Sequence, residues 1–156
     1  MTDIINNKII LMKKERFKFV SACHLFLVKE NKILLSRRFN TGYEDGNYSV
    51  VAGHLDGNES VKKAMIREAK EEAGIDLNEN NLKFAQVMHR KAEEERIDFF
   101  FCADKWSSEI ENKEPRKCDN LQWFDLDKLP DNMVPYVRKA VDNYKKQEIF
   151  DQFGWV

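Results

Sequence analysis

Glu68, Glu71 and Glu72 lie close together in a segment whose apolar residues recur with helical spacing. On a helical wheel of about 100° per residue measured from Val61, the apolar arc runs from 0° to roughly 120°. Glu72 falls at about 20°, within this arc, and Glu68 falls at about −20°, just beside it. Glu71 lies at the margin of the arc. Two carboxylates are therefore predicted to point toward the protein interior.

These glutamates lack the basic neighbours that a solvated helix face would supply. Only Glu71 has a cation three or four positions away, Arg67, whereas Glu68 and Glu72 are like charges four positions apart. Such pairs are mutually destabilising, and burying them unpaired costs far more. A hard divalent cation, which prefers carboxylate oxygens, would compensate them directly. The alternative interpretation is an ordinary charged helix surface.

A helix is predicted to position these side chains. It begins after Ser60, a good N-cap, and ends at Gly74, a good C-cap. A strand over residues 48–55 leads into it. Gly53 and Gly57 would let the backbone approach a phosphate or metal closely, because neither carries a Cβ.

Residues 53–75 also carry a spaced set of glycine, glutamate, arginine and aliphatic residues: Gly53, Glu59, Arg67, Glu68, Ala69, Glu71, Glu72, Gly74 and Ile75. This set resembles, without gap or mismatch, the signature of the Nudix hydrolases, G-x5-E-x7-R-E-U-x-E-E-x-G-U, where U is aliphatic. A chance match has a probability on the order of 10⁻⁸ to 10⁻⁹ per start site. Val51 and Ala52 replace the proline and first glycine that many members have before this segment, which leaves the substrate class open.

The resemblance implies a single domain over residues 1–156 with the α/β/α sandwich and mixed β-sheet of the family. It implies a Mg²⁺ or Mn²⁺ site formed by the glutamates and by a backbone carbonyl around Ala52–Gly53, with Glu59 and Arg67 orienting the ligands. An acidic residue in the loop 105–120 is also implied as a metal ligand or general base. Glu114 is the first choice there and Glu111 the second, and a surface role is an equal alternative. The expected catalytic residues are Arg67, Glu68, Glu71, Glu72 and Glu114, and either Glu71 or Glu114 would take the proton.

Substrate-binding candidates flank this segment. Arg37 and Arg38 end a predicted hairpin and could donate to a phosphate, or be ordinary solvated arginines. Tyr43 and Tyr48 lie in or after a glycine-containing loop and could stack on a base, or cover the core. Asn132 stands where MutT-like members place an asparagine that binds a purine, although an N-cap role explains it equally well.

The remaining elements follow from period and turn signals. Strands are expected at residues 17–29, 32–37, 82–90, 96–103 and 121–126, a short edge strand at 8–14, and a closing helix at 132–149. His24, alone in its strand, is more consistent with a structural role than with a ligand. Phe153 and Trp155 are expected to pack on a neighbouring surface or on a second copy of the chain.

Composition narrows the class of protein. The chain has 156 residues, 42% apolar content and a net charge of −1, which argues against a non-specific nucleic-acid or membrane surface. Its three cysteines form no C-x-x-C pair, so a reduced, cytoplasmic setting is expected. No apolar run resembles a signal peptide or approaches the roughly 20 residues of a membrane helix.

The predicted function is metal-dependent hydrolysis of a phosphoanhydride bond in a nucleoside diphosphate linked to another group. The expected partners are a nucleotide-type small molecule and, as is common in the family, a second subunit of a homodimer. One alternative is a sensor that binds nucleotides or nucleotide sugars without cutting them. Another alternative is an isomerase of isopentenyl diphosphate. It ranks last because that activity needs a catalytic cysteine near the substrate, whereas Cys23 and Cys102 lie in predicted core strands.

Overall fold

The structure is a computed structural model that describes residues 14–156. In that part of the chain, strands and helices follow one another in this order: β1 (Val20–Lys29), β2 (Lys32–Arg38), β3 (Tyr48–Ser49), β4 (Val51–His54), α1 (Val61–Ala73), a short 3-10 helix (Glu79–Asn81), β5 (Lys83–Lys91), β6 (Glu95–Ala103), β7 (Cys118–Asp125), α2 (Pro135–Lys146) and β8 (Phe150–Phe153). No helix in these residues is long and apolar enough to cross a bilayer.

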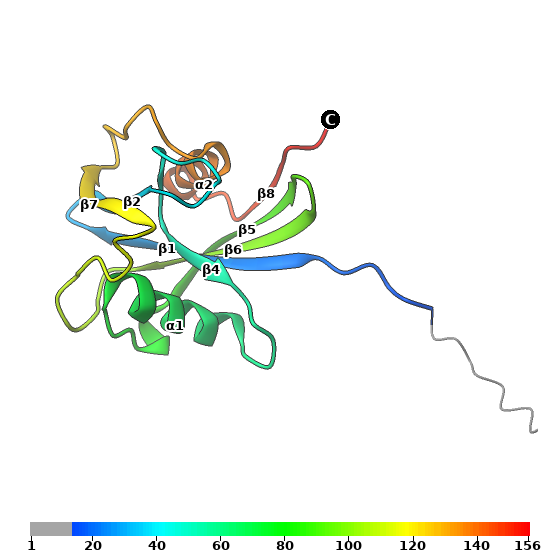
Figure 1. Ribbon diagram of the computed structural model, residues 1–156, viewed down its shortest axis with the longest axis horizontal. Coiled ribbons are helices and arrows are strands. Elements are labelled where there is room, and N and C mark those ends of the chain that lie inside the picture. The colour runs from blue at the N-terminus through cyan, green and yellow to red at the C-terminus, as the bar shows by residue number, and fades with distance from the viewer. Residues whose placement is uncertain (1–13) are drawn as a thin grey trace, which may run out of the picture.

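The strands form a mixed sheet in the order β3-β2-β1-β6-β5-β8, to which β4 adds on β1 and β7 adds on β2. The β1/β6 and β5/β8 pairs are parallel and the other pairs are antiparallel. Helices α1 and α2 cover opposite sides of this sheet (Figure 1). The expected α/β/α sandwich with a mixed sheet is therefore confirmed.

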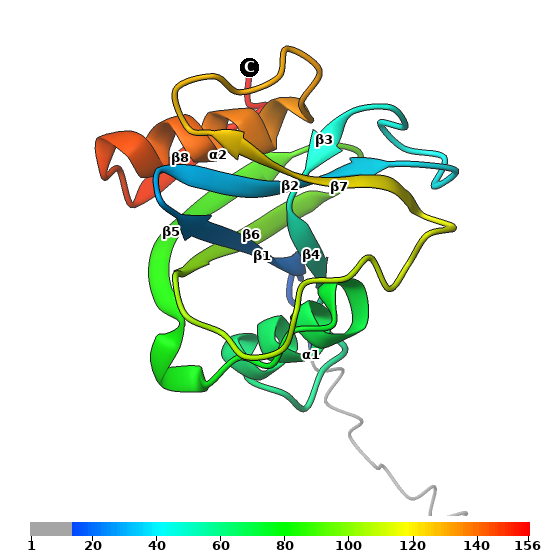
Figure 2. The same cartoon turned by 90° about the vertical axis from the view of Figure 1, so that its left-hand side faces the viewer.

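The alternation of side chains along β1 explains why the sheet has a helix on each face. Cys23, Leu25 and Leu27 belong to the apolar cluster that packs against α1, whereas Phe26 belongs to the cluster that packs against α2. Successive strand residues point to opposite faces, so an unbroken apolar strand requires cover on both. The second view shows the two helices separated by the strands (Figure 2).

Helix α1 begins and ends as the sequence predicts. The Ser60 side chain accepts a hydrogen bond from the Lys63 amide, and Gly74 adopts a left-handed φ of 69° at the C-cap. Helix α2 is shorter than the predicted 132–149. Pro135 occupies its first turn and Val134, not Asn132, is the N-cap residue, because residues 132–134 exchange backbone hydrogen bonds with Tyr48 instead of starting the helix.

Other boundaries also differ from the sequence predictions. The single strand expected at 48–55 divides into β3, which pairs with β2, and β4, which pairs with β1. Residues 150–153 form β8, parallel to β5, and Trp155 donates its ring N–H to the His89 carbonyl at 3.1 Å. The C-terminal aromatic residues thus contact this chain's own sheet. The edge strand expected at 8–14 lies outside the described residues, apart from Lys14.

Candidate active site

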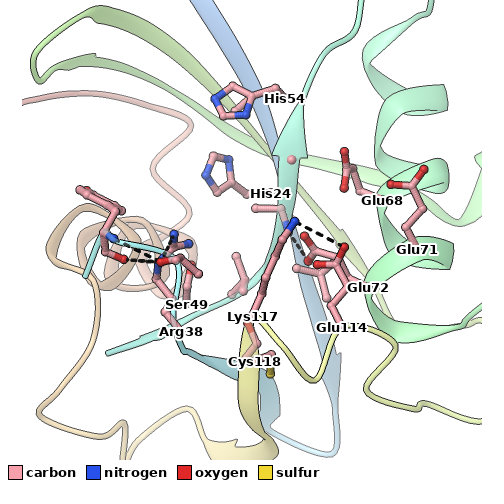
Figure 3. Close-up of a pocket in the computed structure, with 18 of the residues that line it drawn as sticks. His24, Arg38, Ser49, His54, Glu68, Glu71, Glu72, Glu114, Lys117 and Cys118 are labelled. Atoms are coloured by element: carbon pink, nitrogen blue, oxygen red, sulfur yellow. Dashed lines mark hydrogen bonds and ion pairs between the residues drawn. The ribbon is translucent and has the colours of Figure 1, made fainter. Parts of the chain in front are cut away.

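A cavity of about 1120 Å³ is lined by β4, by helix α1, by parts of β1 and β2 and by the loops around them. One part of its lining is acidic, with Glu68, Glu71 and Glu72 from α1 and Glu114 from the loop before β7. Figure 3 shows these four side chains on one side of the cavity. The lining also includes basic side chains, among them Arg37, Arg38, Arg90, Arg96 and Lys117.

Glu72 is the most enclosed of the four carboxylates. The residue as a whole is half-buried, and its carboxyl end is the part that the protein surrounds. One oxygen accepts a hydrogen bond from the Ala52 amide at 3.1 Å. Burial raises the pKa of Glu72 from 4.5 to about 8; the Ala52 hydrogen bond opposes this rise, and the charges of Glu68 and Glu114 add to it. Among the described residues Glu72 forms no ion pair.

Arg67 holds two neighbouring glutamates. Its guanidinium makes two hydrogen bonds to Glu59, of 2.8 and 3.2 Å, and one to Glu68 at 2.7 Å. A longer contact of 3.5 Å reaches Glu71. These carboxylates raise the pKa of Arg67, with Glu59 the largest cause, so the guanidinium is a fixed positive charge that orients the acidic side of the cavity.

Gly53 lies directly against the Glu68 carboxyl group. A Cβ at position 53 would overlap the Glu68 side chain, because β4 crosses α1 at that point. The pKa of Glu68 is raised, mainly by burial and against the effect of Arg67. A side chain at position 53 would therefore require the Glu68 carboxyl group to move.

The oxygen atoms of this part of the cavity are chemically suited to bind a hard divalent cation. Carboxylate oxygens and backbone carbonyls are the ligands that Mg²⁺ prefers, and the enclosed Glu72 carboxylate has no cationic partner in residues 14–156. The described side chains do not form a preassembled group of three ligands, because Glu68 and Glu71 are turned toward Arg67.

The loop before β7 brings only one of its two acidic candidates to the cavity. Glu114 lines it, and a turn in which the Glu114 carbonyl accepts from the Lys117 and Cys118 amides holds it there. Its carboxylate is 4.0 Å from the Lys117 ammonium nitrogen. Glu111 is outside the lining and pairs with Lys113.

The two arginines at the end of β2 both line the cavity, but they differ in their hydrogen-bond partners. Arg37 makes two hydrogen bonds to Asp119, of 2.7 and 3.1 Å, so its charge is already compensated. Arg38 donates to the Tyr43 carbonyl at 2.7 Å and lies 5.2 Å from the centre of the Tyr43 ring. Tyr43 is half exposed and lines the cavity, where its ring is available for stacking.

The structure does not bring Tyr48 or Asn132 into the cavity lining. Tyr48 is 6% exposed, and its ring packs edge-on against Phe124 in the core. Asn132 donates its side-chain N–H to the Gly46 carbonyl at 2.9 Å, so it ties the loop 40–47 to the segment before α2. Both residues support the loop that carries Tyr43 instead of facing the cavity.

The floor of the cavity includes residues that the sequence did not single out. Arg90 is buried, and its guanidinium lies 3.8 Å from the centre of the Tyr136 ring. Arg90 follows Gln86 and Met88 on the inward face of β5, so strand alternation alone could have identified a buried arginine. No local pattern marks Tyr136 or Lys117, which depend on distant segments.

His24 also belongs to the cavity floor. It is 1% exposed, stacks on Phe100 and shares a 3.0 Å hydrogen bond with the Tyr136 hydroxyl. Burial lowers its pKa to about 4, so the imidazole is neutral at pH 7. These contacts agree with the expected structural role and place a neutral ring beneath the acidic wall.

The cysteines near the cavity are protonated thiols. Cys23 is buried and donates toward the Gly53 carbonyl at 3.5 Å, and burial raises its pKa to about 12. Cys118 lines the cavity and donates to the Asn120 carbonyl at 3.3 Å, and burial raises its pKa as well. Neither site favours a thiolate.

Comparison with known proteins agrees with this geometry. A family model described as NUDIX domain matches residues 18–144. The chain is similar to the NAD-capped RNA hydrolase NudC of Vibrio atlanticus (strain LGP32), with 28% identity over 130 residues that cover 79% of this chain and 46% of that protein. It is also similar to the ADP-ribose pyrophosphatase of Methanocaldococcus jannaschii, with 31% identity over 103 residues that cover 65% of this chain and 59% of that protein.

Among solved structures, the crystal structure of the MutT NUDIX hydrolase from Burkholderia pseudomallei superimposes with a TM-score of 0.74 at 28% identity, covering 81% of this chain and 98% of that one. The chain spans less than half the length of the first curated relatives it matches, the NudC proteins. What those relatives act on therefore describes them and not, by itself, this chain.

Proposed function

Because this chain belongs to the Nudix hydrolase family, we propose that it hydrolyses a phosphoanhydride bond in a nucleoside diphosphate linked to another group. One observation carries the proposal. A single cavity is lined by four carboxylates, those of Glu68, Glu71, Glu72 and Glu114, and by a set of basic side chains. The acidic wall suits a divalent cation, and the basic side suits the phosphates that would bind with it.

The cation is proposed to be Mg²⁺ or Mn²⁺, held by Glu68, Glu71 and Glu72 with a backbone carbonyl at Ala52 or Gly53. When bound, it would supply charge neutralisation of the diphosphate and a lowered pKa for a water molecule. Glu72 supplies an enclosed carboxylate already fixed by the Ala52 amide. Binding requires this carboxylate to be ionised, so metal affinity should rise with pH.

The remaining steps fall to side chains of this chain. Arg67 and Glu59 fix the direction of the ligand carboxylates through their paired hydrogen bonds. Arg38 and Lys117 face the cavity as phosphate donors. Glu71 or Glu114, both open to the cavity, takes the proton of the attacking water.

The test is turnover of a substrate panel with Mg²⁺, with Mn²⁺ and with EDTA. The panel contains nucleoside triphosphates, oxidised dGTP, ADP-ribose, NAD and NAD-capped RNA. We expect metal-dependent turnover that falls roughly 100-fold or more in Glu72→Gln, since the variant removes a ligand charge. Glu111→Gln is the matched control, because Glu111 is an exposed glutamate outside the cavity lining.

Three outcomes would contradict the proposal. Full activity in Glu72→Gln would exclude the acidic wall from catalysis. Turnover with EDTA equal to that with Mg²⁺ would exclude it as well. Tight binding of a nucleotide without turnover of any panel member would support the alternative of a sensor.

A further inference from the structure

We propose that Arg90 selects the nucleobase of the substrate, by donating two hydrogen bonds to a base that presents two adjacent in-plane acceptors. Guanine offers such a pair at O6 and N7, and cytosine at O2 and N3. Adenine and uracil offer no adjacent pair of acceptors. This inference rests on the proposed function only in assuming that the ligand is a nucleotide.

The first support is that Arg90 is buried yet incompletely paired. Its side chain is 8% exposed, and its Nε donates to Asp98 Oδ2 at 2.6 Å. Within residues 14–156, the structure gives the two terminal nitrogens of the guanidinium no hydrogen-bond acceptor. Arg90 nevertheless lines the cavity. These two nitrogens are not among the fully buried unpaired atoms of the described residues, so they are open to the cavity and free to donate to a ligand group.

The second support is that the plane of the guanidinium is fixed. Tyr136 covers one face, with its ring centre 3.8 Å from the guanidinium carbon. Tyr136 is itself held by the hydrogen bond between its hydroxyl and His24, and His24 is stacked on Phe100. The Arg90 guanidinium is planar, and Asp98 binds its Nε while Tyr136 covers one of its faces. Its two terminal nitrogens therefore form a rigid pair of donors along the remaining edge.

The third support is charge balance, which separates a base from a phosphate. Asp98 is fully buried and already neutralises Arg90. A phosphate at this position would bring an uncompensated negative charge beside the Asp98 carboxylate, whereas a neutral base edge would not. Arg38 forms no ion pair within residues 14–156, and the Lys117 ammonium nitrogen lies 4.0 Å from the Glu114 carboxylate on the acidic side of the cavity. These two cations serve the phosphates better. Bidentate arginine contacts to O6 and N7 of guanine are a common form of base recognition.

The cavity also offers a surface for the face of the base. Tyr43 lines the same cavity and is half exposed. A base whose edge meets Arg90 would therefore have an aromatic ring within the same pocket on which to stack.

The test is calorimetric binding of GMP, CMP, AMP and UMP, which requires no turnover. We expect GMP or CMP to bind about tenfold tighter than AMP and UMP. In the wild-type protein, 7-deaza-GMP should lose this advantage if guanine is the base, and 3-deaza-CMP if cytosine is the base. Because these analogues change the ligand, the result does not depend on how well any variant folds.

Arg90→Lys keeps the charge opposite Asp98 and removes the fork. We expect it to reduce the preference among the four nucleotides to within about twofold. Arg38→Lys, at another cavity arginine, is the matched control and should weaken all four nucleotides evenly. A merely structural Arg90–Asp98 pair would leave the preference unchanged in Arg90→Lys.

Three results would overturn the inference: equal or tighter binding of AMP or UMP, a preference that survives both the deaza analogues and Arg90→Lys, or no binding of any mononucleotide at millimolar concentration. If the base preference is found but the substrate panel shows no metal-dependent turnover, the proposed hydrolysis fails and the base selection stands.

Discussion

Replacing Glu72 by glutamine should stabilise the metal-free protein at alkaline pH. The folded state raises the pKa of Glu72 from 4.5 to about 8, so it binds more protons than the unfolded state in that interval. The free energy of unfolding therefore falls as pH rises through this window. Glutamine can still accept the hydrogen bond from the Ala52 amide but never ionises.

The magnitude follows from the same two pKa values. Their difference corresponds to an upper limit of roughly 5 kcal/mol. Because Glu72 lines a cavity that water enters, we expect about 2 to 3 kcal/mol of this in practice. The wild type should therefore be less stable than Glu72→Gln by that amount at pH 8.5 in EDTA, and nearly equal to it at pH 4.5.

Urea unfolding of both proteins at these two pH values, each with EDTA and with Mg²⁺, measures the effect. Mg²⁺ should restore the wild type at pH 8.5 and leave Glu72→Gln unchanged, since a bound ligand stabilises only the state that binds it. The reasoning is refuted if the stability difference between the two proteins does not change with pH. It is also refuted if Mg²⁺ stabilises both equally.

Three further predictions concern the elements around this carboxylate. Gly53→Ala should displace the Glu68 side chain and abolish metal-dependent turnover with little change in melting temperature. Activity equal to wild type would show that Glu68 needs no fixed position. Ser60→Ala removes the side-chain acceptor for the Lys63 amide and should cost about 1 kcal/mol in urea unfolding without changing kcat. Glu114→Gln should lower kcat more than it raises KM if this residue takes the proton, and a change in KM alone would assign that role elsewhere.

The acidic wall could be predicted from the sequence because it is local. The helix wheel places Glu68 and Glu72 toward the interior, and Ser60 and Gly74 fix the ends of α1 as expected. Strand and helix periods act over a few residues, so they do not depend on the rest of the fold. The same holds for the two-faced burial of β1, which requires a helix on each side of the sheet.

The part of the cavity formed by Tyr43, Arg90 and Tyr136 could not be predicted, because it depends on contacts between distant segments. Tyr48 and Asn132 were candidates by position, but backbone hydrogen bonds between residues 48 and 132–134 turn them into supports of the loop 40–47. Tyr136 reaches the cavity only because α2 packs across the sheet onto His24 and Arg90. No period or motif within one segment encodes such meetings.

The α1 glutamates and the side chains proposed to bind the base lie on different segments, so they can be substituted independently. Three of the four carboxylates of the acidic wall, those of Glu68, Glu71 and Glu72, stand on α1. Arg67 and Gly53 contact the Glu68 carboxyl group, so few substitutions there would leave these three in place. Arg90, Tyr43 and Lys117 come from three separate segments and touch none of the α1 glutamates in an ion pair among the described residues. Under the two proposals, substitutions at Arg90 and Tyr43 should therefore alter which nucleotide binds and leave the α1 glutamates in place. Arg90→Lys and Glu72→Gln should accordingly have separable effects, on base preference and on turnover respectively, and a double variant should show both losses without further coupling.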